Sequence, residues 1–251
     1  GFIEKILEPS KDNAFLGQLR QWTGKIARFG ALNSLAQTLL KLTCPGAPDL
    51  YQGTELWDLH FVDPDNRQAV DFEQRHNFLA EIKKREKESL QPLLLDLLAH
   101  WEDGRVKLFL IYKALNFRRR QKALFQNGSY VPLTVSGMAA SHVCGFARRD
   151  GAVWSVVAVP RLSTAIFSTE NAPLGRQGSW EDTALELPGD SPGTWSDVFT
   201  RETLSVGKTA DGKRYLYLRD LFRDFPVALL ESSSTASKAT PASLPLEERL
   251  Q

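Results

Sequence analysis

The sequence predicts a two-part fold, in which a largely helical portion of α/β type is followed by an all-β module. Apolar residues recur at three- and four-residue intervals through much of residues 2–120, which is the helical period. Near Lys122 the pattern changes to short runs that alternate Val, Phe, Tyr and Trp with polar residues, separated by Gly, Pro and Asp. One short apolar piece, Pro48–Tyr51, ends at Gln52-Gly53 and predicts a single strand that opens into a loop. The predicted divisions are 1–121 (mostly helical), 122–231 (β-sandwich) and 232–251 (a disordered tail).

Length and composition exclude several classes of protein. A chain of 251 residues with 42% hydrophobic content can bury one large core or two smaller ones. The 31 basic and 30 acidic side chains give a net charge of +1, so we predict no nucleic-acid partner and no binding to an anionic membrane. No apolar run approaches the ~20 residues that span a bilayer, and the first residues lack a basic-then-apolar signal. We therefore expect a cytoplasmic protein that acts on a neutral substrate.

The two cysteines, Cys44 and Cys144, stand in separate segments without metal-ligand spacing. Each has apolar residues, Pro or Gly beside it. We predict buried free thiols in preference to a disulfide bridge, which suits a reducing compartment. The sequence predicts neither a metal site nor a cofactor.

The first helical stretch is predicted to contain two helices separated at Gly30. Its apolar stripe consists of Phe15, Leu16, Leu19, Trp22, Ile26 and Phe29, and the helix after Gly30 carries Leu35, Leu39, Leu40 and Leu42. Two helices followed by one strand cannot close a parallel barrel, because a lone strand has no partners in a sheet. We therefore expect further segments of the fold before this stretch.

Three more helical or apolar segments follow. Asp71–Arg85 predicts a helix whose charged continuation, residues 81–88, faces solvent. Gln91–His100 is strongly apolar and should be buried, with His100 as a cap or surface residue rather than a ligand. Gly104–Arg120 predicts an amphipathic helix that ends in three arginines, which favour a helix carboxyl terminus through its dipole and need no anion site.

The remaining sequence predicts an antiparallel β-sandwich. The expected strands are Tyr130–Val135, His142–Arg148, Val153–Val159, Thr183–Leu187, Arg214–Leu218 and Pro226–Glu231, with a hairpin turn at Arg149-Asp150-Gly151. Trp154, Trp180 and Trp195 could form a carbohydrate-binding face, but a place in the core is the preferred interpretation, because large aromatics dominate small β cores. The Ser-, Thr-, Ala- and Pro-rich residues 232–251 are expected to be disordered.

The candidate site is the polar, turn-rich and aromatic stretch Pro45–Arg67, PGAPDLYQGTELWDLHFVDPDNR. Its aromatic faces could stack on sugar rings, and its carboxylates and amides could accept hydrogen bonds from sugar hydroxyls. The residues assigned to this substrate-binding rim are Tyr51, Gln52, Glu55, Trp57, Asp58, Asp63, Asp65 and Arg67. The alternative is that Asp-Pro-Asp-Asn is turn chemistry with no ligand, since Asx side chains bond their own backbone.

The run from Asn33 to Arg75 resembles the maltooligosyltrehalose synthase family, also called (1→4)-α-D-glucan 1-α-D-glucosylmutase. The specific part is YQGTELWD at 51–58 followed by VDPDNR at 62–67, whereas the wider α-amylase superfamily shares only a looser Pro-Gly-x-Pro and Tyr-x-Gly-x-Glu form. Further similarity lies at 115–119, 125–130, 143–148 and 159–162, so the resemblance covers roughly residues 1–231. It implies the eighth strand and last helices of a (β/α)8 barrel, followed by the sandwich.

The resemblance also implies an activity. Enzymes of this family turn the reducing-end α-1,4 link of a maltooligosaccharide into an α,α-1,1 link by intramolecular transglucosylation, without a cofactor. Their catalytic carboxylates lie on earlier barrel strands, so we assign no catalytic residue here and expect this chain to be a carboxyl-terminal portion that is inactive alone. The alternatives are a non-catalytic glucan-binding or scaffold module, or the tail of another α-amylase-superfamily enzyme. Uncovered barrel helices would favour self-association.

Overall fold

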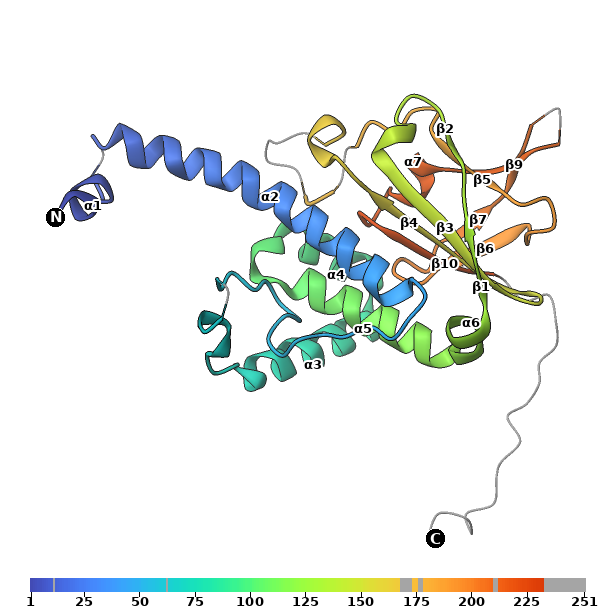
Figure 1. Ribbon diagram of the computed structural model, residues 1–251, viewed down its shortest axis with the longest axis horizontal. Helices are drawn as coiled ribbons and strands as arrows, with labels where there is room; N and C mark the ends of the chain where they lie inside the picture. The colour runs from blue at the N-terminus through green and yellow to red at the C-terminus, as the bar shows by residue number, and fades with distance from the viewer. Residues whose placement is uncertain (11, 62, 168–172, 176–177, 210–211, 233–251) are drawn as a thin grey trace, which may run out of the picture.

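The computed structural model describes residues 1–10, 12–61, 63–167, 173–175, 178–209 and 212–232. Figure 1 shows a group of helices packed beside two β-sheets, with one long helix that projects away from the body at its amino-terminal end. The helices are α1 (Phe2–Ile6), α2 (Ala14–Thr43), α3 (Phe72–Glu88), α4 (Leu90–Ala99), α5 (Arg105–Arg120), α6 (Lys122–Asn127) and the short α7 (Leu218–Leu221). Within these residues no helix is long and apolar enough to cross a membrane.

Helix α2 is continuous through Gly30, so the predicted break there is wrong. The glycine has no neighbouring atom within 4 Å of where a Cβ would lie, and an interior glycine costs only about 1 kcal/mol relative to alanine. Packing of the carboxyl-terminal half outweighs this cost, because Leu35, Leu39 and Leu42 are completely buried. The amino-terminal half is different, since most of its side chains are exposed.

The strand predicted at Pro48–Tyr51 is absent, and residues 47–51 run as an irregular segment between α2 and the turns that begin at Gln52. A strand needs a neighbour for its backbone N–H and C=O groups, and both sheets lie in the later part of the chain. This segment therefore gives no support to the expected eighth barrel strand.

The other predicted helical segments are confirmed, but the expectation that the charged residues 81–88 face solvent is wrong for Glu86, which is buried and pairs with Lys113 and Arg201. Helix α3 begins where Asp71 caps it, with Asp71 Oδ1 accepting from Gln74 N at 2.8 Å. The apolar segment after it is α4, whose Leu94, Leu97 and Leu98 are buried, and His100 is its exposed carboxyl-terminal cap. Helix α5 packs against α2, α3 and α4 and forms the centre of the helical group.

The β module contains two sheets in which every pairing is antiparallel, as predicted. The larger sheet has the order β1 (Ser129–Pro132), β3 (Val143–Asp150), β4 (Val153–Pro160), β10 (Ala228–Ser232), β6 (Thr194–Asp197) and β7 (Thr203–Ser205). The smaller sheet has the order β2 (Val135–Ser136), β5 (Ala184–Leu187), β9 (Arg214–Tyr217) and β8 (Gly207–Lys208). Strands β6, β7 and β8 were not predicted. The predicted strand Tyr130–Val135 is divided between β1 and β2, and the first residues of the predicted β module form helix α6.

The two sheets face each other across a common core. A Cβ at Gly145 on β3 would lie 2.4 Å from Leu185 Cδ2 on β5, so the glycine admits the leucine side chain from the opposite sheet. Trp154, Trp180 and Trp195 are 3%, 3% and 0% exposed. They are core residues, and the interpretation of these tryptophans as a carbohydrate-binding face is wrong.

The helical group and the β module are joined by buried polar contacts. Glu86 on α3 accepts from Lys113 Nζ on α5 at 2.5 Å and from Arg201 Nη2, which follows β6, at 2.7 Å. The cysteines are free, as predicted, but half-buried, and burial raises the pKa of the Cys44 thiol. The expected disordered tail lies, apart from Ser232, outside the described residues.

Candidate carbohydrate-binding rim

The loop between α2 and α3 is held in place by Arg75, in the first turns of α3. Arg75 donates to Glu55 Oε2 (3.1 Å), to Gly53 O (2.7 Å) and to Asp71 O (2.9 Å). Glu55 Oε2 also accepts from the backbone N–H of Gly53 at 3.0 Å. Glu55 thus fixes the turn through Oε2, and it lines neither of the two hollows described below. Arg75 was not among the predicted site residues, since its partner lies 20 residues earlier in the chain.

The side chain of Trp57 is held in position by contacts with residues of the helical group. Its indole N–H donates to Trp101 O at 2.6 Å, and the two rings meet edge to face with centroids 6.5 Å apart. Lys107 on α5 lies 5.8 Å from the centre of the Trp57 ring and donates to Leu56 O at 3.2 Å. Burial lowers the pKa of Lys107, and the charge of Asp58 partly opposes this shift. Sequence reasoning missed Lys107, because a lysine in an amphipathic helix ordinarily faces solvent.

The three aspartates of the rim all have local partners. Asp58 Oδ1 accepts from His60 N (3.1 Å) and lies 2.7 Å from His60 Nδ1, and these contacts, led by the backbone hydrogen bond, lower the pKa of Asp58. Asp63 pairs with Arg67 through two contacts of 2.5 and 2.6 Å. Asp65 accepts from Phe61 N at 2.7 Å. The Asp65 contact to a backbone N–H is of the kind that the alternative interpretation describes, whereas Asp63 pairs with a side chain and Asp58 lies outside the Asp-Pro-Asp-Asn run.

The structure brings only part of the predicted set together. Gln52, Trp57 and Asp58 line a hollow of about 220 Å³ with His60, Gln68 and Arg75. A second, more apolar hollow of about 490 Å³ adjoins it, and Trp57 and Asp58 line both. Helix α2 supplies one wall of the second hollow through Ile26, Gly30 and Ser34. Tyr51, Asp63, Asp65 and Arg67 line neither hollow.

This arrangement suits a neutral polar ligand. The hollows combine the indoles of Trp57 and Trp101 with carboxylate, amide and imidazole groups, which can exchange hydrogen bonds with hydroxyls. Beside them Leu59 and Phe61 are 90% and 86% exposed, so this part of the loop offers apolar surface that nothing in the described chain covers. Among the described residues, no cluster of three His, Cys, Asp or Glu side chains is placed to hold a metal ion.

No protein-family model matches the chain. Two curated proteins from strains of Mycobacterium tuberculosis, provisionally named maltooligosyl trehalose synthase, are 35% identical to it over 230 residues. A solved maltooligosyltrehalose synthase from Arthrobacter ramosus matches 92% of this chain with a TM-score of 0.67 and 30% identity. A further solved maltooligosyl trehalose synthase matches 88% with a TM-score of 0.56 and 26% identity.

These matches confirm the resemblance seen in the motifs and extend it to the fold. The matches to the curated relatives and to the Arthrobacter protein cover 92% of this chain, but only 24% of each curated relative and 26% of the Arthrobacter protein. The chain therefore spans about a quarter of the length of the relatives that it matches, and it fits a carboxyl-terminal portion of such a protein.

Proposed function

Because the chain resembles maltooligosyltrehalose synthases over most of its length, we propose that it is the carboxyl-terminal portion of an enzyme that forms maltooligosyl trehalose. The reaction would convert the reducing-end α-1,4 link of a maltooligosaccharide into an α,α-1,1 link within the same molecule. The observation that carries the proposal is the 35% identity over 92% of the chain, together with the shared fold.

The catalytic carboxylates would belong to a part of the enzyme outside this chain. Retaining glycosyl transfer uses a nucleophilic carboxylate and an acid/base carboxylate about 5 to 5.5 Å apart. In the rim, Glu55 is held by Arg75, Asp58 by His60 and Asp63 by Arg67. Carboxylates that stabilise turns and ion pairs in this way are poorly suited to attack an anomeric carbon.

The rim would position the glucan and keep water out. An isomerase of this kind must exclude water from its glycosyl-enzyme intermediate, because hydrolysis would otherwise compete with transfer. Trp57 and Asp58 line both hollows, the exposed Leu59 lines the second one, and the exposed Phe61 follows two residues later in the loop. In the longer enzyme this apolar part of the loop would close over the sugar or against the remainder of the barrel.

The first test incubates the purified chain with maltopentaose. We expect no non-reducing product, because covalent catalysis is lost, and so is general acid–base catalysis, which alone contributes roughly 10² to 10⁴ in rate. Turnover by this chain alone would contradict the placement of the carboxylates. Amide substitutions at Glu55, Asp58 and Asp63 would then identify the responsible group.

The second test is a chimera in which this chain replaces the matching quarter of the Arthrobacter ramosus synthase. Formation of a non-reducing product would support the proposal, and the Arthrobacter protein cut before that quarter is the control. A folded chimera that releases only reducing sugars would instead favour the tail of a hydrolase. Circular dichroism and a thermal transition establish that the chimera is folded before either result is interpreted.

A further inference from the structure

The outer face of the smaller sheet carries a pair of tyrosines that is separate from the rim. Tyr215 and Tyr217 lie two residues apart on β9, so both rings stand on the same face of the sheet. Their centroids are 4.8 Å apart and the rings meet edge to face. A hydrogen bond between the two phenols raises the pKa of Tyr215, which is a further sign that the pair is held together.

Small residues lie opposite both tyrosines, and the ring of Tyr215 packs directly over one of them, Gly207. Across the sheet, Ala184 on β5 is opposite Tyr217, and Gly207 on β8 is opposite Tyr215. One hollow, of about 190 Å³, lies toward β5 and β2, and another, of about 330 Å³, lies toward β7 and β8. Both tyrosines line both hollows, so the two hollows and the tyrosine pair form one groove across the sheet.

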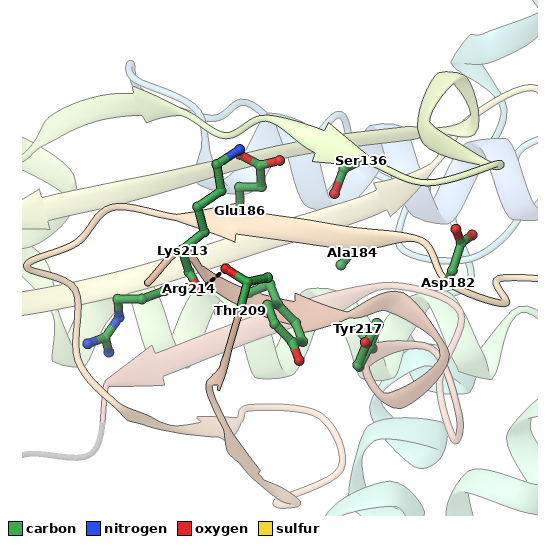
Figure 2. A pocket seen from close by; sticks show the side chains of 9 residues that line it. Ser136, Asp182, Ala184, Glu186, Thr209, Lys213, Arg214 and Tyr217 are labelled. Atoms are coloured by element: carbon green, nitrogen blue, oxygen red, sulfur yellow. Dashed lines mark hydrogen bonds and ion pairs between the residues drawn. The ribbon is translucent and has the colours of Figure 1, made fainter. Parts of the chain in front are cut away.

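Polar side chains surround the tyrosines in the first hollow. Figure 2 shows Lys213 and Glu186 together at one end, where their charged groups are 3.8 Å apart, and Asp182 at the other end. Ser136 on β2 contributes a hydroxyl. The second hollow is lined by further polar groups, including Ser205, Glu202, Asp220 and Arg223.

The charges of the groove indicate a neutral ligand. In the first hollow, Asp182 and Glu186 balance Lys213 and Arg214. In the second, two acidic side chains face one arginine, which is itself paired with Glu202 at 3.2 Å. Neither hollow has the positive excess that attracts phosphates or nucleic acids. Aromatic faces between hydrogen-bonding groups without a positive excess match a polyhydroxylated ligand.

We propose that this groove is a second carbohydrate site, which binds a linear α-1,4-glucan at a distance from the rim. Arg219 lies 4.1 Å from the centre of the Tyr217 ring and covers one of its faces, so one sugar ring stacks on the faces of the pair that remain open. The neighbouring sugar rings extend into the two hollows, where carboxylate and hydroxyl groups hydrogen-bond to them. The choice of an α-1,4-glucan rests on the proposed function, whereas the preference for a neutral sugar chain rests on the groove alone. Such a site would hold the polymer near an enzyme that acts on its end.

The test titrates maltoheptaose, and separately cellohexaose, into the ¹⁵N-labelled 251-residue chain and follows its amide resonances. With maltoheptaose we expect shifts on β5, β8 and β9, and calorimetry provides the affinity. Tyr217→Ala should weaken binding at these strands by about tenfold or more, because it removes half of the aromatic pair.

A glycine pair gives a sharper comparison. An added Cβ at Gly207 would lie 2.4 Å from Tyr215 Cε2, so Gly207→Ala should displace the ring and weaken binding without removing an aromatic group. Gly189 has open space around it, and Gly189→Ala should bind like the unchanged chain. Both variants replace one glycine with alanine. The added methyl group contacts the Tyr215 ring at position 207 and no neighbouring atom at position 189.

Three results would overturn the proposal. One is the absence of shifts on β5, β8 and β9 with either sugar, and another is unchanged affinity in both Tyr217→Ala and Gly207→Ala. The third is binding of cellohexaose alone, which would keep a sugar site but reject the α-glucan. Failure of the proposed enzymatic function would appear separately, as a folded chimera that forms no non-reducing product while the groove still binds maltoheptaose.

Discussion

The guanidinium of Arg148 on β3 donates through Nη1 to the carbonyl oxygen of Thr43, the last residue of α2, at 3.2 Å. The same side chain is 2% exposed and reaches the carbonyl oxygens of Leu124 and Phe125 (3.3 Å each) and of Gly128 (2.8 Å). Burial lowers the pKa of Arg148, and no carboxylate is among these partners. One buried cation thus satisfies carbonyl groups at the ends of two helices and joins them to the sheet.

We predict that Arg148→Met destabilises the protein by about 3 kcal/mol or more, because it leaves several buried carbonyl groups without a donor. Urea unfolding followed by circular dichroism measures the change. The matched control is Arg149→Met at the next position, which loses an ion pair with the exposed Asp190. The control should cost less than about 1 kcal/mol, and equal losses in the two variants would contradict the role of Arg148.

The pH dependence of stability should contain a contribution from Asp197. Its carboxylate is buried and accepts from Phe199 N (2.7 Å) and Thr200 N (2.9 Å), and burial raises its pKa to about 7. In the unfolded chain an aspartate titrates near pH 4. Between these values the folded state holds a proton that the unfolded state has released, so this residue's contribution to the free energy of unfolding falls as pH rises from about 4 to 7.

Asp197→Asn should remove this contribution while keeping an oxygen acceptor for the two backbone N–H groups. We expect the stability of the variant relative to the unchanged chain to rise between pH 5 and pH 8, by about 1.4 kcal/mol for each pKa unit crossed. Urea unfolding at both pH values measures this difference. Asp190→Asn, on an exposed side chain, should show no such change. A pH-independent difference for Asp197→Asn would show that the carboxyl does not titrate in this range.

The projecting half of α2 should promote self-association. Phe15, Trp22 and Ile26 are 52%, 63% and 49% exposed on this helix, and contiguous apolar surface of this kind favours contact with another surface. Light scattering should give a mass that increases with protein concentration, and Phe15→Ser combined with Trp22→Ser should reduce the increase. A monomeric mass at every concentration would contradict this prediction.

The rim should control the ratio of hydrolysis to isomerisation in the proposed enzyme. In the chimera with the Arthrobacter synthase, Trp57→Ala should raise the share of free glucose severalfold, because removing the indole opens both hollows to water. Chromatography of the products of maltopentaose measures the ratio. Asp63→Asn is the control, since Asp63 pairs with Arg67 and lines neither hollow. An unchanged ratio in Trp57→Ala would remove this residue from the site.

Local patterns in the sequence determine much of the fold. The 3.6-residue period predicts α5 almost residue for residue, and the predicted start of the next-earlier long helix at Asp71 lies within one residue of the observed start of α3. Alternation predicts β3, β4 and the hairpin between them. These elements depend on contacts between near neighbours in the chain, which the sequence displays directly. By contrast, β8 has only two residues, too few to show a period.

The sequence by itself determined where the candidate rim lies, which residue types it offers, and the family that its motifs resemble. Only the tertiary structure decided what those residues do, because their partners come from distant parts of the chain. Arg75 donates a hydrogen bond to Glu55, and Trp101 and Lys107 contact Trp57. The strand expected at Pro48–Tyr51 fails for the same reason, since a strand exists only through a partner. The groove around Tyr215 and Tyr217 likewise arises from the register of β5, β8 and β9, which no period in the sequence specifies.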